Sequence, residues 1–399
     1  MVSITRSTKE LLTQLDIEKI YTHVLNLHYE RSPVFSVDNL TKAQLYIEDQ
    51  FRKYGYRPEL HTFTVKGDNT PYSNVQAKLN SESEILITSH FDHIRGSPGA
   101  DDNLSAVAIM LEIARVCRKG NVDLPIEFIS FNLEEQNPFL HRQILEKGIE
   151  LGLHDNFEIP KTFHFQKMRD LLSQKTKKAF GEEIGKEKIH ELAFSEIEDN
   201  LTEVEKEYFK YLINVTNNPE SRNWSGLFGV NGSSHYVEDL VANDAHAVKG
   251  VINLEACGYT SKSPHSQTFP EGLDTRHFPS YKIDDPTIGD FIAVVSDGNS
   301  SDLGNSFLQS CEESDIDLPC ILIGVPLHFE QIRGSLPDLL RSDHAPFWKA
   351  HIPALMITDT ANFRNPYYHT PGDTITTLDF DFILKVAKAA FLTALKHFG

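Results

Sequence analysis

The feature that most constrains this chain is a series of five potential metal ligands, each placed where a hydrophobic, strand-like run gives way to a turn. The runs are ILITSHFD (residues 85–92), GADDN (99–103), EFISFNLEE (127–135), VINLEA (251–256) and NPYYHTPGD (365–373). The ligand candidates that they carry are, in chain order, His90, Asp102, Glu135, Glu255 and His369. In open α/β sheets, binding sites form beyond the carboxyl ends of the strands. A fold of this kind would gather the five side chains at one place.

Strand-like and helix-like patterns alternate along the chain. Helical spacing occurs at residues 42–54, 105–117 and 380–398, and a glycine follows the first two segments closely as a helix stop. Buried strands are predicted at residues 85–91, 126–133, 248–254, 291–296 and 354–358. Such alternation predicts an α/β fold with a mainly parallel central sheet and helices on both faces.

The types of side chain in the series indicate a divalent metal ion. Imidazole and carboxylate groups together suit zinc, although cobalt or manganese can fill the same sites. Two such ions can hold a water molecule between them and activate it for hydrolysis. Taken singly, each candidate has an ordinary structural explanation, since aspartates in a glycine-rich turn commonly serve turn formation or helix capping. Because five candidates recur in the same local setting, we predict a metal site.

Composition argues against several classes of partner and location. The chain has 399 residues and a formal net charge of −19, which opposes general binding to nucleic acids or anionic membranes, both of which are negatively charged. The four cysteines form no Cys-x-x-Cys pair, so neither a disulfide framework nor a thiolate zinc site is expected. The N-terminal residues are polar, and no run reaches the roughly 20 apolar residues of a membrane span. We expect a soluble, cytoplasmic protein.

Residues 137–226 interrupt the alternation. This segment is dense in Lys and Glu, and it has helical periodicity at residues 168–174 and 189–213. We predict one domain, made of residues 1–136 and 227–399, that is interrupted by a helical insertion at residues 137–226. The insertion either packs on a small core of its own or serves as a lid or an oligomerisation element.

Six sequence blocks carry a resemblance to a known family. They are HFDH, GADDN, LEE, INLEACGY, SDHAPFW and YYHTPGDT, and they resemble the signature blocks of the dizinc aminopeptidases. That family of co-catalytic zinc exopeptidases includes bacterial leucine aminopeptidases and glutamate carboxypeptidases, with the glutaminyl cyclases as relatives. The resemblance covers about residues 35–136 and 227–399 and implies the zinc exopeptidase fold, which is phosphorylase/hydrolase-like. Family members continue their Glu-Glu pair with x-G-L-x-G-S, whereas here the insertion follows and residues 226–234 supply the delayed remainder.

The resemblance also implies a role for each ligand candidate. Asp102 would bridge two zinc ions, His90 and Glu255 would complete one of them, and Glu135 and His369 would complete the other. Glu255 stands where family members carry Asp or Glu. The resemblance further implies a cis peptide bond between Asp102 and Asn103.

Three further residues are assigned catalytic or supporting roles by the same resemblance. Glu134 would be the general base that moves a proton from water to the leaving amine. Asp92 would orient the imidazole of His90, and Tyr368 would donate a hydrogen bond to the developing oxyanion.

Other polar residues in these blocks receive structural interpretations. His93 is expected to be structural, as are His328 and His351. His344 is not expected to be a ligand. Ser342 or Asp343 either caps a helix or lines the substrate pocket.

The predicted function is a dizinc exopeptidase acting on peptides, most simply an aminopeptidase. A single-zinc glutaminyl cyclase and a carboxypeptidase remain alternatives on the same fold, as does a non-catalytic module like the transferrin receptor relatives. A bridging aspartate with five ligands favours two ions over one, and the presence of Glu134 opposes a non-catalytic module. Arg341 and Arg364 lie in blocks near the predicted site, but no basic cluster for a substrate carboxylate is identifiable. The sequence predicts no oligomeric state.

Overall fold

The computed structural model describes residues 8–81, 83–153, 171, 186–243, 248–270, 272–273 and 275–398. The chain divides into two compact units. Unit 1 comprises Met1–Phe63, Pro71–Gln136 and Gly229–Gly399, and unit 2 comprises Thr64–Thr70 and Asn137–Phe228. In the part of the chain that is described, no helix combines the length and apolar character needed to cross a membrane.

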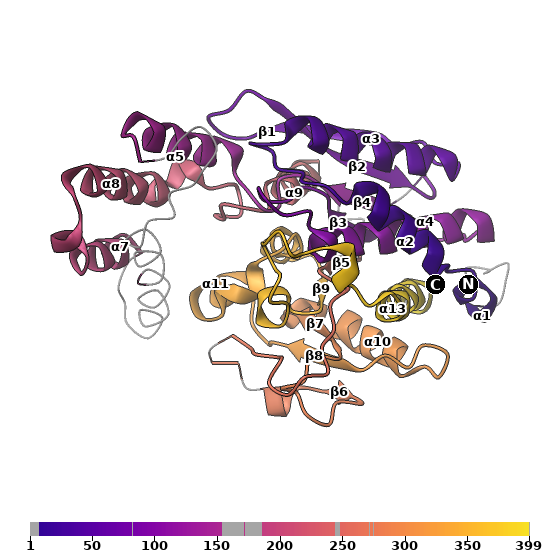
Figure 1. Cartoon of the computed structure of the whole chain (residues 1–399). Helices are drawn as coiled ribbons and strands as arrows, with labels where there is room; N and C mark the ends of the chain where they lie inside the picture. The colour runs from indigo at the N-terminus through magenta and orange to yellow at the C-terminus, as the bar shows by residue number, and fades with distance from the viewer. Residues whose placement is uncertain are drawn as a thin grey trace. The chain divides into compact units, whose positions relative to one another are not determined.

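A nine-stranded sheet runs through the fold in the order β1-β2-β4-β3-β5-β9-β7-β8-β6 (Figure 1). Its strands are β1 Glu59–Thr64, β2 Pro71–Lys78, β3 Ile85–His90, β4 Ile126–Phe131, β5 Gly250–Glu255, β6 Ser280–Tyr281, β7 Ile292–Ser296, β8 Cys320–Gly324 and β9 Ala354–Thr358. Pairing is parallel between β4 and β3, β3 and β5, β5 and β9, and β7 and β8. It is antiparallel between β2 and β4, β7 and β9, and β6 and β8. The predicted α/β class is confirmed, and antiparallel pairs border and interrupt the parallel centre.

The parallel centre of the sheet brings distant strand ends to one edge. Strand β3 ends at His90, which lies opposite Phe131 at the end of β4. Strand β5 pairs with the other side of β3 and ends at Glu255, which lies opposite Thr358 at the end of β9. The carboxyl ends of these strands therefore face the same side of unit 1.

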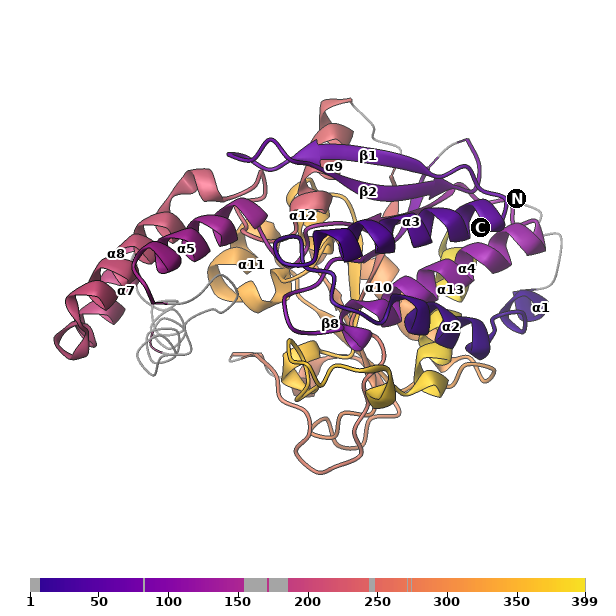
Figure 2. The same cartoon turned by 45° about the horizontal axis from the view of Figure 1, so that its top comes forward.

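One face of the sheet is covered by the main hydrophobic core. The helices packed there are α1 Thr8–Leu12, α2 Ile17–Leu27, α3 Val37–Lys53, α4 Ala106–Gly120, α10 Ser301–Glu312 and α13 Phe380–His397. Alternate strand residues such as Ile85, Ile87 and Phe128 point into this core, as the two-residue period of a strand requires. Figure 2 shows α3 and α4 side by side. Helix α4 is buried along most of its length because it is enclosed by α2, α3, α13 and the sheet.

The opposite face of the sheet is covered by α9 Asn231–Ala242 and α12 His344–Lys349, with α11 Phe329–Ser335 packed on α12. The aromatic rings of Phe131, Tyr236 and Phe347 meet here with centroids 5.9–6.4 Å apart. Helices therefore cover both faces of the sheet, as predicted.

Several elements differ from the sequence prediction. Helix α3 begins at Val37, five residues before the predicted start, and β5 spans Gly250–Glu255 instead of residues 248–254. Strands β1, β2, β6 and β8 were not predicted from the sequence. Strand β1 has an exposed, polar sequence with one buried residue, so its place in the sheet comes from tertiary pairing and not from a hydrophobic period.

The described residues of unit 2 are mainly helical. Its helices are α5 Pro138–Glu150, α7 Lys186–Ser195 and α8 Glu203–Asn217. The helical period predicted for residues 189–213 is present as α7 and α8, separated by a 3-10 turn at Glu198–Asn200. A capping box between Thr202 and Glu205 starts α8. The helix predicted at 168–174 lies outside the described residues, apart from Leu171.

Unit 2 has a hydrophobic cluster of its own, made of Ala193, Phe194, Ile197, Leu201 and Phe209. The proposal of a helical insertion with a small core is consistent with this cluster.

Candidate metal and active site

The five predicted ligands come together in unit 1. His90 and Glu255 are the last residues of β3 and β5, and Glu135 lies in the turn after β4. Asp102 belongs to the helical turn Ala100–Ser105 that leads into α4, and His369 lies in the loop between β9 and α13. His90 is fully buried, and Asp102 and Glu255 are only 2% and 7% exposed.

Asp102 lies between two groups of side chains. On one side its Oδ1 is 3.4 Å from Nε2 of His90, and that nitrogen is 3.3 Å from Oε2 of Glu255. On the other side its Oδ2 is 3.2 Å from Nε2 of His369, and that nitrogen is 3.0 Å from Oε2 of Glu135. Asp102 Oδ1 has no hydrogen-bond partner among the described residues although it is buried. Each carboxylate oxygen of Asp102 thus faces a different histidine.

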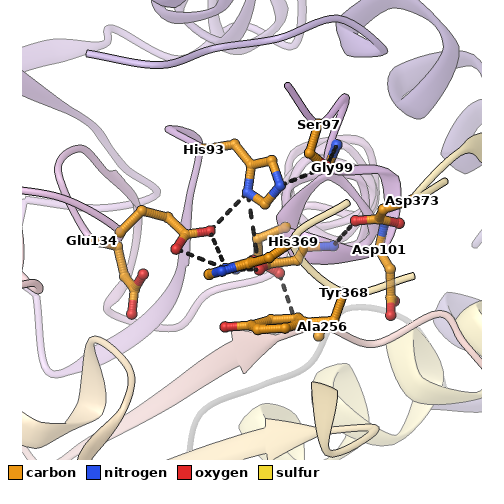
Figure 3. A network of polar contacts seen from close by, with 12 residues as sticks. His93, Ser97, Gly99, Asp101, Glu134, Ala256, Tyr368, His369 and Asp373 are labelled. Atoms are coloured by element: carbon orange, nitrogen blue, oxygen red, sulfur yellow. Dashed lines mark hydrogen bonds and ion pairs between the residues drawn. The ribbon is translucent and has the colours of Figure 1, made fainter. Parts of the chain in front are cut away.

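Glu134 and His93 also enter the cluster. Oε2 of Glu134 is 3.8 Å from Nε2 of His90. His93 lies on the other side, where its Nδ1 is 2.7 Å from Oε1 of Glu135 (Figure 3). The sequence analysis missed His93. Its place three residues after His90, in the turn leaving the same strand, was the available signal.

The turn that carries Asp102 is fixed by its neighbour Asn103. The peptide bond between them is cis, as expected from the resemblance. The Asn103 side chain donates to the carbonyl of Leu254 at 3.0 Å and accepts from the amide of Ala256 at 3.0 Å. These two bonds hold the turn against the end of β5, where Glu255 lies.

The backbone takes an unusual conformation beside three of the site residues. Leu133, Ala256 and His369 have φ angles of 58°, 46° and 58°. Residues with a Cβ rarely adopt this left-handed region, and such positions cluster at functional sites. The turns that present Glu134, Glu255 and the His369 imidazole therefore depend on the surrounding structure.

Gly229 and Gly232, which follow the insertion in the sequence, lie against the turn that carries Glu134 and Glu135. The amide of Val230 donates to the carbonyl of Glu134 at 2.7 Å. A Cβ on Gly229 would lie 2.4 Å from that same carbonyl oxygen, and one on Gly232 would lie 2.2 Å from the carbonyl oxygen of Asn132. Only glycine permits so close an approach. The two halves of the interrupted motif are thus adjacent in the folded chain.

Asp92 makes different contacts from those expected. Its carboxylate accepts hydrogen bonds from the amides of Glu134 at 3.0 Å and Glu135 at 3.2 Å. Nδ1 of His90 is 3.2 Å from the backbone carbonyl oxygen of Asp92 but 3.7 Å from its carboxylate. The carbonyl therefore orients the His90 ring, and the carboxylate positions the Glu134–Glu135 turn.

Residues 342–348, the SDHAPFW segment, contact site residues and their neighbours. The hydroxyl of Ser342 donates to Oε2 of Glu255 at 2.7 Å, and Asp343 accepts from the hydroxyl of Ser233 at 2.6 Å. Asp343 occupies the N-cap position of α12, but its side chain makes no capping bond. The capping interpretation is therefore wrong, because the Asp343 side chain bonds to Ser233 and the Ser342 side chain bonds to Glu255. His344 is buried and contacts the carbonyl of Leu339 at 2.8 Å, so it is not a ligand.

Tyr368 stacks on His369, with ring centroids 3.8 Å apart. Its hydroxyl lies 3.4 Å from Nη2 of Arg341. Tyr368, Arg341 and Glu255 line a pocket of about 590 Å³, a volume that includes open solvent. The rest of the lining is largely apolar and includes Phe269, Leu273, Val295, Ile323 and Met356. Arg364, the other arginine near the predicted site, is buried and bonds to Gln267 at 2.7 Å.

The buried charges shift one another strongly. Burial alone would lower the pKa of His369, but the carboxylates of Glu135 and Asp102 outweigh it and raise that pKa to about 10. Burial alone would raise the pKa of Asp102, yet the adjacent His369 and His90 side chains hold that pKa well below its usual range. Burial, together with Glu255 and Glu135, raises the pKa of Glu134 well above its usual range despite the nearby His90. The two histidines thus supply positive charge in the acidic cluster.

The donor set fits divalent metal ions. His93, Asp102, Glu135 and His369 can direct their donor atoms to one point, and His90, Glu134 and Glu255 can direct theirs to a second. With zinc bonds of 2.0–2.1 Å, ligand atoms of a tetrahedral site lie about 3.3 Å apart. The contacts of Asp102 with His90 at 3.4 Å and with His369 at 3.2 Å match this spacing.

Comparison with known proteins supports the class indicated by the fold and the cluster. The profile of Peptidase family M28 matches residues 74–155 and 328–394. The predicted resemblance to the zinc exopeptidases is confirmed, because two segments of the chain are similar to Peptidase family M28. His90, Asp102, Glu135 and His369 lie within the matched residues, whereas Glu255 lies between them.

Individual proteins are similar to this chain in sequence or in fold. YfbL of Escherichia coli (strain K12) is 26% identical over 397 residues, which cover 96% of this chain and 88% of YfbL. The structure of the Legionella pneumophila LapA aminopeptidase has a TM-score of 0.57 at 16% identity, covering 100% of this chain and 76% of LapA. The structure of Macrostomum lignano glutaminyl cyclase has a TM-score of 0.55 at 13% identity, covering 100% and 95% of the two chains. These findings support a peptidase with metal-dependent, exopeptidase-like function.

Proposed function

We propose that the protein is a dizinc aminopeptidase. The observation that carries this proposal is the position of Asp102, whose two carboxylate oxygens face His90 at 3.4 Å and His369 at 3.2 Å. A carboxylate with one oxygen directed to each of two donor groups is suited to bridge two ions. His90 and Glu255 would complete one ion, and Glu135 and His369 would complete the other.

Bound zinc would polarise the substrate carbonyl and lower the pKa of a water molecule to near neutrality. The protein side chains would do the rest. Glu134, whose Oε2 is 3.8 Å from Nε2 of His90, would accept the proton of the water and return it to the leaving amine. Tyr368, which stacks on His369 and lines the pocket, would donate its hydroxyl hydrogen to the developing oxyanion.

Selectivity for a free amino terminus is supported by charge. Two zinc ions would offset the negative charge of their ligands Asp102, Glu135 and Glu255, which leaves Glu134 as the carboxylate available to a substrate ammonium group. The apolar pocket beside Glu255 would receive the side chain of the N-terminal residue, so apolar residues are the expected substrates.

Two alternatives remain testable. The first is a single-zinc glutaminyl cyclase, because a solved cyclase resembles this fold with a TM-score of 0.55, compared with 0.57 for LapA. The contact of His369 with Glu135 at 3.0 Å favours a second ion and so argues against the cyclase. A carboxypeptidase is kept because Arg341 lines the pocket. Arg341 is 2.8 Å from Oδ1 of Asn362 and 3.7 Å from Asp338, so its charge is partly neutralised.

Metal analysis and a matched pair of variants test the proposal. The parent protein should bind two equivalents of zinc. Glu134→Gln should keep both ions while activity falls at least 10²-fold, as expected for a general base, whereas Glu135→Gln should weaken one ion. A single ion, with Glu135 or His369 dispensable for metal binding, would favour the cyclase. Equal metal loss in both variants would disprove the separate roles of these neighbours.

A substrate panel decides which end of the peptide is cleaved. Aminoacyl substrates with apolar side chains should be hydrolysed, and the same substrates with a blocked amino group should not. Faster hydrolysis of N-blocked dipeptides with a free carboxyl terminus would establish the carboxypeptidase instead.

A further inference from the structure

His93 is a buried histidine to which the proposed mechanism gives no role. It has no exposed surface, and both of its ring nitrogens have close polar neighbours. Nδ1 is 2.7 Å from Oε1 of Glu135, and Nε2 is 2.9 Å from the hydroxyl oxygen of Ser97. Figure 3 shows its ring beside that of His369, with Ser97 and Gly99 on the far side of the His93 ring.

The position of the His93 ring is fixed by Ser97 and Gly99. Gly99 has a φ angle of 57°, and a Cβ at this residue would lie 2.6 Å from Cδ2 of His93. The amide of Gly99 donates to the hydroxyl oxygen of Ser97 at 3.2 Å. The Ser97 hydroxyl can donate to Nε2 of His93, whereas the carboxylate oxygen of Glu135 that faces Nδ1 can only accept. This arrangement leaves the ring hydrogen on Nδ1, which faces Glu135.

Distances distinguish a metal ligand from a hydrogen-bond donor at this position. His93 Nδ1 is 2.7 Å from Glu135 but 3.9 Å from Oδ2 of Asp102, and neither value is near the spacing of about 3.3 Å between tetrahedral zinc ligands. A zinc ion bonded to both atoms of the 2.7 Å contact would have an angle of about 80° there instead of about 109°. In contrast, 2.7 Å is typical of a charged hydrogen bond.

We propose that His93 is a positioning residue for Glu135. Its Nδ1–H group donates to Oε1 of Glu135, which is also 3.1 Å from Nε2 of His369. This leaves Oε2, which is 3.0 Å from the same nitrogen, to bind the ion. A carboxylate held in one rotamer by such a contact binds metal more tightly. This role rests on the proposed zinc ion at Glu135 and His369.

Two amide substitutions separate this role from direct ligation. The nitrogen of His93→Asn can take the position of Nδ1, whereas the nitrogen of His93→Gln can reach only the position of Nε2. The readout is the zinc affinity of each of the two ions, measured by competition with a chromophoric chelator. His93→Ala and His93→Gln should weaken one ion by about 10–100-fold, and His93→Asn should stay close to the parent. At saturating zinc, all three should bind two equivalents and recover kcat.

Each other outcome overturns the proposal. If His93→Asn loses the ion as fully as His93→Ala, His93 is a ligand. If His93→Gln and His93→Ala both keep the parent affinity, His93 has no role in metal binding. His23→Gln, which alters a buried histidine on α2, controls for general destabilisation, and thermal unfolding of the metal-free variants checks folding. Failure of the dizinc proposal would be visible separately, as fewer than two equivalents in the parent protein.

Discussion

Arg31 provides the strongest test of how the loop between His90 and Asp102 is held. This residue lies between α2 and α3 and has no exposed surface. The five hydrogen bonds that it donates among the described residues all go to backbone carbonyls, at 2.6–3.3 Å: those of Leu27, Tyr29, Phe91, Pro98 and Gly99. Burial lowers its pKa to about 10, opposed by nearby carboxylates that include Asp373 and Asp102. Arg31 therefore remains charged at neutral pH and ties both ends of the loop at residues 91–99.

Replacing Arg31 by Met should destabilise the protein severely. Met preserves apolar volume but donates no hydrogen bond, so five carbonyl groups lose a donor. Nη1 contacts three of these carbonyls but carries only two hydrogens, so four N–H donors are lost. At about 1 kcal/mol for each net hydrogen bond, the loss is about 4 kcal/mol. That equals a large part of the roughly 5–15 kcal/mol by which a folded protein is stable. Arg31→Lys retains three donors and should cost less than half as much.

Urea unfolding followed by circular dichroism measures this effect, and hydrogen exchange of residues 91–99 localises it. Arg57→Met is the matched control, because Arg57 is exposed and its replacement should change the free energy of unfolding by less than about 0.5 kcal/mol. If Arg31→Met unfolds within about 1 kcal/mol of the parent, the five bonds do not hold the loop and the reasoning is refuted.

Two further predictions concern pH and packing. Burial lowers the pKa of His23, which lies between the hydroxyls of Tyr46 and Tyr54, to about 3. Below about pH 6.5 the unfolded chain therefore binds more protons than the folded chain. Up to about 5 kcal/mol of stability that is present above pH 6.5 should be lost as the pH falls toward 3. Urea unfolding of His23→Gln should show a smaller loss, and equal pH dependence in both proteins would contradict the assignment. Gly232→Ala should cost about 1–3 kcal/mol of stability by overpacking against the Asn132 carbonyl, and it should weaken the binding of one zinc ion. Gly334→Ala, where a Cβ meets nothing within 4 Å, should be neutral or slightly stabilising. Equal unfolding midpoints for the two variants would contradict the close contact at Gly232.

The amino-acid sequence by itself determined the parts of this protein that depend on local pattern. Hydrophobic runs of strand length located β3, β4, β5, β7 and β9, and the last of these matches its prediction residue for residue. His90 and Glu255 end two of those runs, and Glu135 lies in the turn after a third. Asp102 and His369 lie in the turn motifs GADDN and NPYYHTPGD. A strand end carries a local signature, because a buried run must stop where the chain turns, and for this reason the ligand candidates could be found before any fold was known.

Only the tertiary structure decided which groups contact one another. His93 was dismissed because nothing near it in the sequence indicates Glu135, which lies 42 residues away and is adjacent only because β3 and β4 pair in parallel. Arg31 carries no sequence signal at all, since its partners are carbonyl groups that every residue possesses. The polar strand β1 joins the sheet for a similar reason, through backbone pairing that its side chains do not encode. Contacts of this kind depend on the three-dimensional path of the backbone, which brings together segments whose local sequences are independent of one another.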